Sequence, residues 1–147
     1  MPLAYEIPPR QTPSSDSEYL EQMTKTIFQA GFSWRVIRNK WDNFLKAFDG
    51  FDIDTVASYG LEDLERLVTD AGIVRNRKKI AATVENTQTL QTIIQQHGSF
   101  KVYLETVPVN YYEREKILTK QFRNLGRTSA FVFLYCVNEN VPDWQDR

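Results

Sequence analysis

A short stretch near the C-terminal end combines positive charge with a backbone that can turn sharply between two helices. Asn124 tolerates a left-handed backbone, and Gly126 allows a close turn before Thr128 starts the next helix. Such a turn leaves backbone N–H groups free at a helix N-terminus, with Arg123 and Arg127 beside them. The stretch predicts a helical hairpin that binds the phosphates of a nucleic acid, although a glycine-containing turn can equally be a plain connection.

Charge is unevenly distributed along the sequence. The formal net charge is −1, which on its own argues weakly against nucleic-acid binding. Acidic residues dominate positions 49–70, whereas basic residues dominate positions 75–79 and 114–127. This segregation can place a positive face on a nearly neutral protein, as DNA binding requires. The run at 75–79, which contains no acid, can equally be the solvated start of a helix.

Length and composition are those of one folded domain. The chain has 147 residues, of which 41% are hydrophobic, enough to bury a full core. We expect a single domain over residues 1–147, with the Pro- and Ser-rich residues 1–16 as an extended arm. No apolar run approaches the roughly 18 residues of a membrane span, and the N-terminus lacks a signal-peptide pattern. We therefore expect a cytoplasmic protein without a membrane partner, and we expect it to be a monomer.

Apolar residues recur at helical spacing through most of the chain, which predicts an all-α fold. Ser33 and Asp52 are the expected caps of two of the helices. Residues 100–112 are compatible with a strand or a helix, and Pro108 ends whichever forms. The run at 130–137 is apolar on all sides, so we expect it to be a buried central helix, although its composition alone also allows a strand. The expected helices cover about 17–30, 33–48, 52–58, 61–71, 79–97, 113–122 and 128–137.

Three ordered blocks carry a resemblance to a known family. They are Phe28–Trp34, Phe48–Asp52 and Val68–Ile80, with Asn43-Phe44 between the first two. The chain resembles the DNA-3-methyladenine glycosylase I family on these blocks, and Leu125-Gly126 keeps half of the superfamily's hairpin pattern Leu-Pro-Gly-hydrophobic-Gly. The resemblance implies an all-helical fold of the helix-hairpin-helix glycosylase superfamily. It also implies action on duplex DNA, with a damaged base flipped into a pocket between two lobes.

The resemblance also marks candidate residues for binding the base. Tyr5 and Trp34 match the family's base-stacking aromatic residues. Trp34 stands at the first position of a helix after a glycine-bounded turn, where it could face a cleft or belong to the core. Thr26 occupies the position, eight residues before Trp34, where the family has a Glu that reads the methylated adenine. This departure leaves the recognised lesion open.

The expected chemistry needs little acid catalysis. Alkylation at N3 or N7 makes a purine cationic and weakens its glycosidic bond, so stacking and water activation can suffice. Asp143 lies close to the place where the wider superfamily carries an Asp that activates water, although it can equally be a surface carboxylate. Thr128 stands where bifunctional relatives have a lysine, so we expect a monofunctional enzyme without a Schiff-base step.

Family members commonly tie their two ends together with zinc bound by two Cys and two His. In this chain Glu6 follows Tyr5 where a His is usual, and residues 137–144 contain neither His nor Cys. The lone Cys136 and the lone His97 are too few for a disulfide or a structural zinc site. We therefore expect no metal and no cofactor.

Three functions are compatible with these residues. The first is a DNA repair N-glycosylase that excises an alkylated purine from duplex DNA. The second is a non-catalytic DNA-binding module that kept the helix-hairpin-helix fold, as the missing Glu at Thr26 allows. The third is an all-helical protein-interaction domain, which would leave the separated basic runs unexplained.

Overall fold

The computed structural model describes residues 8–147, so the predictions for Tyr5 and Glu6 lie outside the described part of the chain. The all-α prediction is confirmed, because residues 8–147 contain helices and no strand. The α-helices are α1 (Asp16–Gln29), α2 (Trp34–Ala47), α3 (Ile53–Ala57), α4 (Leu61–Val68), α5 (Arg77–His97), α6 (Phe100–Thr106), α7 (Tyr111–Gln121) and α8 (Arg127–Cys136). Two 3-10 turns, η1 (Asp49–Phe51) and η2 (Trp144–Asp146), complete the described elements.

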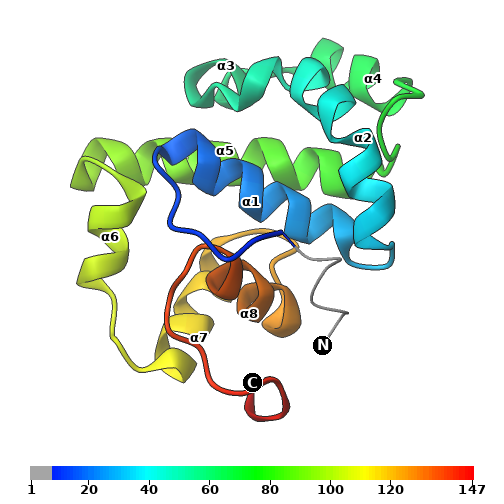
Figure 1. Cartoon of the computed structure of the whole chain (residues 1–147). Helices are drawn as coiled ribbons and strands as arrows, with labels where there is room; N and C mark the ends of the chain where they lie inside the picture. The colour runs from blue at the N-terminus through cyan, green and yellow to red at the C-terminus, as the bar shows by residue number, and fades with distance from the viewer. Residues whose placement is uncertain (1–7) are drawn as a thin grey trace.

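The long helix α5 runs across the middle of the molecule (Figure 1). Helices α2, α3 and α4 lie on one side of it, and α6, α7 and α8 lie on the other. Helix α1 lies alongside α5 and contacts α2, α3, α6 and α8, so it joins the two groups. None of the described helices has the length and hydropathy that crossing a membrane requires.

Side-chain caps fix where the helices begin. The Ser33 hydroxyl accepts a hydrogen bond from Val36 N at 3.2 Å, and an Asp52 carboxylate oxygen accepts from Thr55 N at 3.1 Å. Both caps are as predicted. Helix α1 begins at Asp16 with Ser15 as its cap, so the extended arm is one residue shorter than expected. The stretch left ambiguous at 100–112 forms α6 and the start of α7, and α4 ends at Val68 rather than at residue 71.

Aromatic side chains make up much of the core between α1, α2 and η1. The Trp41 ring stacks between Phe44 and Phe51, with ring centres 5.2 Å apart on each side, and therefore serves packing. Helix α8 is buried over Ala130–Leu134 and at Cys136, as predicted for a central helix. Six phenylalanines have no exposed surface: Phe28, Phe44, Phe48, Phe51, Phe100 and Phe133.

One of the family-like blocks is explained by a close approach between the turn after α4 and helix α2. Asn43 Nδ2 donates a hydrogen bond to Gly72 O at 3.1 Å, and Gly72 N donates to Asp70 Oδ1 at 2.8 Å. A Cβ atom at Gly72 would meet the Asn43 side chain at 3.2 Å and Asp70 Oδ1 at 3.1 Å. The absence of a side chain at Gly72 therefore lets the turn after α4 sit against α2.

The described part of the arm is attached to the C-terminal end of α8. Arg10 Nε donates to Tyr135 O at 2.9 Å, and a second guanidinium nitrogen donates to Glu139 O. Gln11 N donates to Cys136 O at 3.0 Å. Carbonyls in the last turn of a helix lack helical partners, and the arm supplies donors there: Tyr135 O also accepts from Asn138 N at 3.1 Å, whereas Cys136 O accepts from Gln11 N. The positive guanidinium complements the negative end of the helix.

Candidate functional site

The predicted hairpin is formed by α7, a five-residue turn over residues 122–126, and α8. Phe122 and Leu125 point into the core, with 3% and 2% of their surface exposed, and they hold the turn against the protein. Asn124 has a left-handed backbone with φ of 58°, as expected. Gly126 caps α8 in an extended conformation with φ of −78°, so Asn124 rather than Gly126 provides the unusual backbone of this turn.

The N-terminus of α8 presents free backbone donors to solvent. The first hydrogen bond of the helix runs from Ala130 N to Gly126 O at 2.8 Å, and the described hydrogen bonds include no acceptor for the amides of residues 127–129. A Cβ atom at Gly126 would meet nothing within 4 Å, so the space beside the cap of α8 is open. All five predicted DNA-binding residues are exposed around this point: Arg123, Asn124, Gly126, Arg127 and Thr128. The arrangement suits a phosphate.

A buried amide on α5 holds the turn in place, and sequence reasoning missed it. Asn86 is 1% exposed, and its Oδ1 accepts from Arg123 N at 2.6 Å while its Nδ2 donates to Arg123 O at 3.0 Å. The amide thus satisfies both backbone groups of the residue that begins the turn. Asn86 and Arg123 are 37 residues apart in the sequence, so the sequence does not indicate that they contact each other. The available signal was an Asn on the apolar side of a predicted helix.

Both arginines of the hairpin have partners in the free protein. Arg123 Nε lies 3.3 Å from a carboxylate oxygen of Glu85, in a pair whose side chains are 75% and 56% exposed. Arg127 donates a hydrogen bond to the carbonyl oxygen of Arg147, and Arg147 Nε reaches Thr128 Oγ1 at 3.4 Å. These contacts are exposed and therefore weak, so a phosphate can replace them.

Two of the three candidate base-contacting residues are buried in the described structure. Trp34 is 3% exposed and belongs to the core, but its buried Nε1 has no hydrogen-bond partner among residues 8–147. Thr26 is 1% exposed, and its hydroxyl donates to Gln22 O at 2.9 Å. Tyr5 lies outside the described residues. An unpaired buried indole N–H is costly, which makes the surroundings of Trp34 a place where a polar group can be accommodated.

Asp143 is exposed at the start of η2. This short turn is fixed to α7 by a hydrogen bond from Tyr112 OH to Asp146 O at 2.7 Å. The neighbouring Trp144 ring packs edge-on against Phe131 of α8, with ring centres 5.4 Å apart. Asp143 is thus held near the two helices of the hairpin. No contact between Asp143 and Trp34 occurs among the described residues, and their sharing of one cleft stays a prediction.

Comparison with protein families decides what this chain is related to. The family model described as methyladenine glycosylase matches residues 11–132, which include α1 to α7, the turn and the first half of α8. The chain belongs to the methyladenine glycosylase family.

Curated relatives agree with this membership over part of the chain. DNA-3-methyladenine glycosylase 1 of Escherichia coli strain K12 is 44% identical over 75 residues, and DNA-3-methyladenine glycosylase of Haemophilus influenzae is 32% identical over 75 residues. Each match covers 50% of this chain and 40% of the relative. The matched part therefore spans less than half of the length of these relatives.

Solved structures of the family have the same fold. The 3-methyladenine DNA glycosylase I of Staphylococcus aureus matches with a TM-score of 0.77 and 27% identity, over 87% of this chain and 79% of that one. A mutant of the same enzyme matches with a TM-score of 0.80 and 26% identity, over 91% and 83% of the two chains. The helical architecture of this family member is therefore that of 3-methyladenine DNA glycosylase I.

An exposed aromatic ring stands out on the loop between α1 and α2, and sequence reasoning missed it as well. Phe32 is 45% exposed, directly after Gly31, whose φ of 88° turns the chain. Lys79 Nζ lies 5.4 Å from the centre of this ring and also donates to Phe28 O at 3.3 Å. The lysine thereby fixes the loop at the end of α1. A phenylalanine between Gly31 and a capping serine was the signal for an exposed ring.

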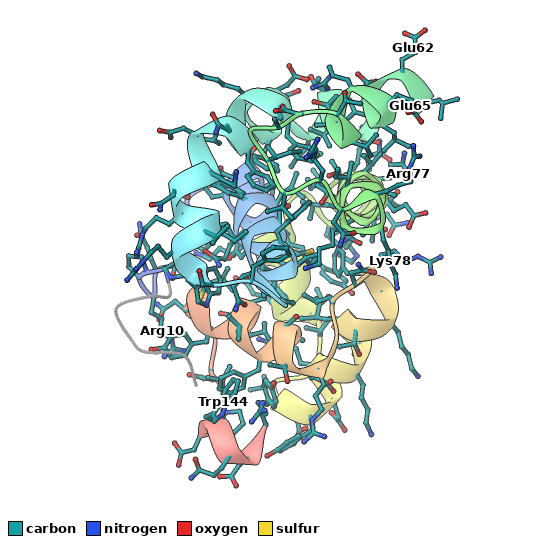
Figure 2. The ribbon with its side chains drawn as sticks, turned by 90° about the vertical axis from the view of Figure 1, so that its right-hand side faces the viewer. Arg10, Glu62, Glu65, Arg77, Lys78 and Trp144 are labelled. Atoms are coloured by element: carbon teal, nitrogen blue, oxygen red, sulfur yellow. The ribbon has the colours of Figure 1, made fainter. Side chains whose placement is uncertain are left out.

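The basic run at 75–79 is less free than its sequence indicates. Arg77 pairs with Glu65 of α4 at 2.7 Å, and Lys79 is used at the end of α1. Burial lowers the pKa of Lys79. The run has no acid close to it in the sequence, but in the folded protein α4 brings Glu65 to the start of α5. The expectation of a run without a nearby acid is therefore wrong for the folded protein. In Figure 2 the Lys78 side chain extends away from the body of the protein.

The sequence predicts a protein without a zinc site, which depends on where its potential metal ligands lie. Among residues 8–147, no three His, Cys, Asp or Glu side chains are grouped so that they could hold a metal ion. Cys136 is buried, and burial raises the pKa of its thiol to about 12. The thiol is therefore neutral at physiological pH, which makes it a poor metal ligand.

Proposed function

We propose that this family member is a DNA N-glycosylase that removes an alkylated purine of the 3-methyladenine type from duplex DNA. The observation that carries the proposal is the family match over residues 11–132 together with an exposed hairpin whose amides and arginines suit DNA phosphates. Both curated relatives are named as 3-methyladenine glycosylases. The protein acts as a single-domain monomer on a damaged duplex.

DNA binds first through the hairpin. The open amides at the start of α8 and the side chains of Arg123 and Arg127 bind consecutive phosphates of one strand. Asn124 and Thr128 flank this phosphate site, and both are exposed. The affinity from these contacts is independent of sequence and decreases with salt, because phosphate binding releases counterions.

Phe32 supports the extrusion of the base. An exposed apolar ring at a tight turn can enter the base stack and occupy the space that the flipped nucleotide leaves. Lys79 holds the loop from beneath and adds a positive charge on the side of the ring. Truncation of Phe32 therefore weakens base flipping more than it weakens binding to undamaged DNA.

The flipped base stacks on Tyr5 and on Trp34, whose ring is 3% exposed in the free protein and has to be uncovered as the base enters. Thr26 supports the site through its hydrogen bond to Gln22. The alkylated purine is a cationic leaving group, so its glycosidic bond needs little further polarisation. Asp143 activates a water molecule for attack on the sugar carbon and stabilises the oxocarbenium ion that develops there. Thr128 cannot form a Schiff base, so the reaction ends at the abasic site.

A second function is favoured by one observation. Trp34 and Thr26 are buried, so residues 8–147 present neither side chain to an incoming base. A protein that kept the hairpin but cannot admit a base would be a non-catalytic DNA-binding module. The two functions can be distinguished because only the glycosylase releases a free base.

Incubation with methylated duplex DNA, followed by chromatography of the released bases, tests the proposal. We expect 3-methyladenine to be released, in single turnover, with little released by Asp143→Asn. Duplex binding without release of any alkylated purine would favour the binding module. Absence of both binding and release would refute both functions.

A further inference from the structure

A cavity of about 230 Å³ lies between the arm, one face of α1 and the end of α8. The arm contributes proline rings and Gln11, α1 contributes charged and amide side chains, and α8 contributes the buried thiol of Cys136. Gln22, which lines the cavity, is one helical turn before Thr26. The cavity therefore adjoins the position at which the resemblance predicts reading of the base.

The wall formed by the arm is fixed on both sides of the cavity. On the α8 side, Gln11 N donates to Cys136 O at 3.0 Å, and Asn138 Nδ2 donates to Thr12 Oγ1 at 3.1 Å. On the α1 side, Ser14 Oγ donates to a Glu18 carboxylate oxygen at 2.9 Å. Because successive residues of the arm are bonded to different helices, the cavity is a built feature of the fold.

Gln22 is oriented by Thr26. Its Nε2 donates to Thr26 Oγ1 at 3.4 Å, while its Oε1 has no partner among the described residues. This leaves one amide hydrogen and the amide oxygen for another molecule. An amide with both groups available matches the neighbouring amino donor and ring acceptor of adenine. Gln11, on the opposite wall, adds a second amide.

Glu21 supplies the negative charge of the cavity. Its Oε1 accepts from Trp41 Nε1 at 3.2 Å, and its second oxygen has no partner among residues 8–147. Glu18 also lines the cavity, but it is occupied by Ser14, which holds the pKa of Glu18 below its usual value. Lys25 opposes these carboxylates, with its ammonium 4.9 Å from the centre of the Trp41 ring. The lining carries two carboxylates against one ammonium, while Arg10 lies outside it at the end of α8, so the walls themselves favour a cation.

We propose that Gln22 and Glu21 determine which base this protein accepts, with Gln22 reading the adenine edge and Glu21 pairing with the positive charge of the alkylated ring. This inference rests on the proposed function. Thr26 itself is 1% exposed and therefore cannot contact the base directly. The inference assigns recognition of the base to the turn of α1 that precedes Thr26. A carboxylate and an amide placed one residue apart on α1 recognise a cationic aminopurine and discriminate against a purine that carries an oxygen in place of the amino group.

The test compares Glu21→Gln and Gln22→Leu with matched controls on exposed positions outside the cavity. Glu62→Gln on α4 and Gln96→Ala on α5 serve as controls, and Figure 2 shows Glu62 at the far edge of the molecule. Single-turnover release of 3-methyladenine and of 7-methylguanine is measured from methylated duplex. In parallel, free 3-methyladenine is titrated while the side-chain amide resonances of Gln11 and Gln22 are followed.

We expect Glu21→Gln to reduce release of 3-methyladenine about tenfold or more, because the negative charge that pairs with the cationic ring is removed. Gln22→Leu should lower the ratio of 3-methyladenine to 7-methylguanine release by a similar factor, which a purely structural role of Gln22 would not do. Both variants should bind duplex DNA like the unmodified protein, because the hairpin is intact.

The outcomes separate this inference from the proposed function. Release by the unmodified protein with unchanged rates and ratio in both variants overturns the inference and leaves the function standing. No release, but a titration of the Gln11 amide by 3-methyladenine that is lost in Gln22→Leu, supports the inference and refutes the glycosylase function. Neither release nor titration refutes both.

Discussion

Asn86→Ala should damage the DNA-binding hairpin without replacing any residue that faces DNA. The substitution removes two hydrogen bonds, to Arg123 N at 2.6 Å and to Arg123 O at 3.0 Å, from a site that is 1% exposed. Each bond contributes about 0.5–1.5 kcal/mol, and a buried amide left unpaired costs about 1–3 kcal/mol. Because these terms overlap, we expect a loss of about 2–4 kcal/mol in the free energy of unfolding.

Urea denaturation measures the stability term, and thermal denaturation should show a decrease of about 4–16 °C in Tm. Duplex affinity is then measured at several salt concentrations. Because the turn carries Arg123 and precedes the open amides of α8, its displacement should weaken binding and reduce the slope of log affinity against log salt by about 1 or more.

Thr92→Ala on the same helix is the matched control, since Thr92 is exposed and, within residues 8–147, its hydroxyl bonds only to its own helix, at Gln88 O. It should leave stability within about 0.5 kcal/mol of the unmodified protein. The reasoning is refuted if Asn86→Ala unfolds at the same urea concentration as the control and binds DNA with the same salt dependence. A loss of stability with unchanged DNA binding would restrict Asn86 to the fold.

Further predictions concern four single side chains and the removal of metal. Arg127→Ala should weaken binding to all duplexes alike and reduce the salt slope by about 1, and an unchanged slope would make the hairpin purely structural. Glu85→Gln should tighten duplex binding about two- to fivefold at low salt, because it removes the acid that pairs with Arg123; equal affinity would discount this competition. Asp143→Asn should leave DNA binding intact and slow base release about 100-fold or more, and full activity would indicate a mechanism based on stacking alone. Arg10→Ala should lower the free energy of unfolding by about 1–2 kcal/mol, because it removes a donor and a positive charge from the end of α8. A chelator should leave the Tm of the unmodified protein unchanged, and unfolding by the chelator would reveal a metal.

Most of the fold is predictable from local sequence signals. Helical spacing of apolar residues and the caps at Ser33 and Asp52 mark helix positions because both act within a few residues of the chain. Residues 100–112 were ambiguous because α6 has only seven residues, too few for its periodicity to exclude a strand. Its helical conformation depends on the Ser99 cap and on burial of Phe100 and Leu104.

The site is predictable only where its residues are contiguous. The hairpin could be recognised because Asn124 and the basic residues follow one another along the chain. The partners of its arginines could not, since Glu85 and Arg147 approach through tertiary packing. The burial of Trp34 depends on several helices at once, and a residue at the first position of a helix has no periodicity that decides its environment.

The hairpin is held from two sides by polar contacts that can perform the tying role the resemblance assigns to zinc. Near the turn, Asn86 bonds to the backbone of Arg123. At the other end, Arg114 of α7 pairs with Glu139 at 2.8 Å and also donates to Leu104 O at 3.0 Å, with only 11% of its side chain exposed. Arg10 of the arm donates to the carbonyl of the same Glu139. Glu139 therefore joins the arm, α7 and the segment after α8, and since α7 and α8 are the two helices of the hairpin, this junction fixes their relative position. A charge as buried as that of Arg114 is tolerated because its donors are satisfied, so disruption of the junction should move the phosphate-binding turn as well as destabilise the fold.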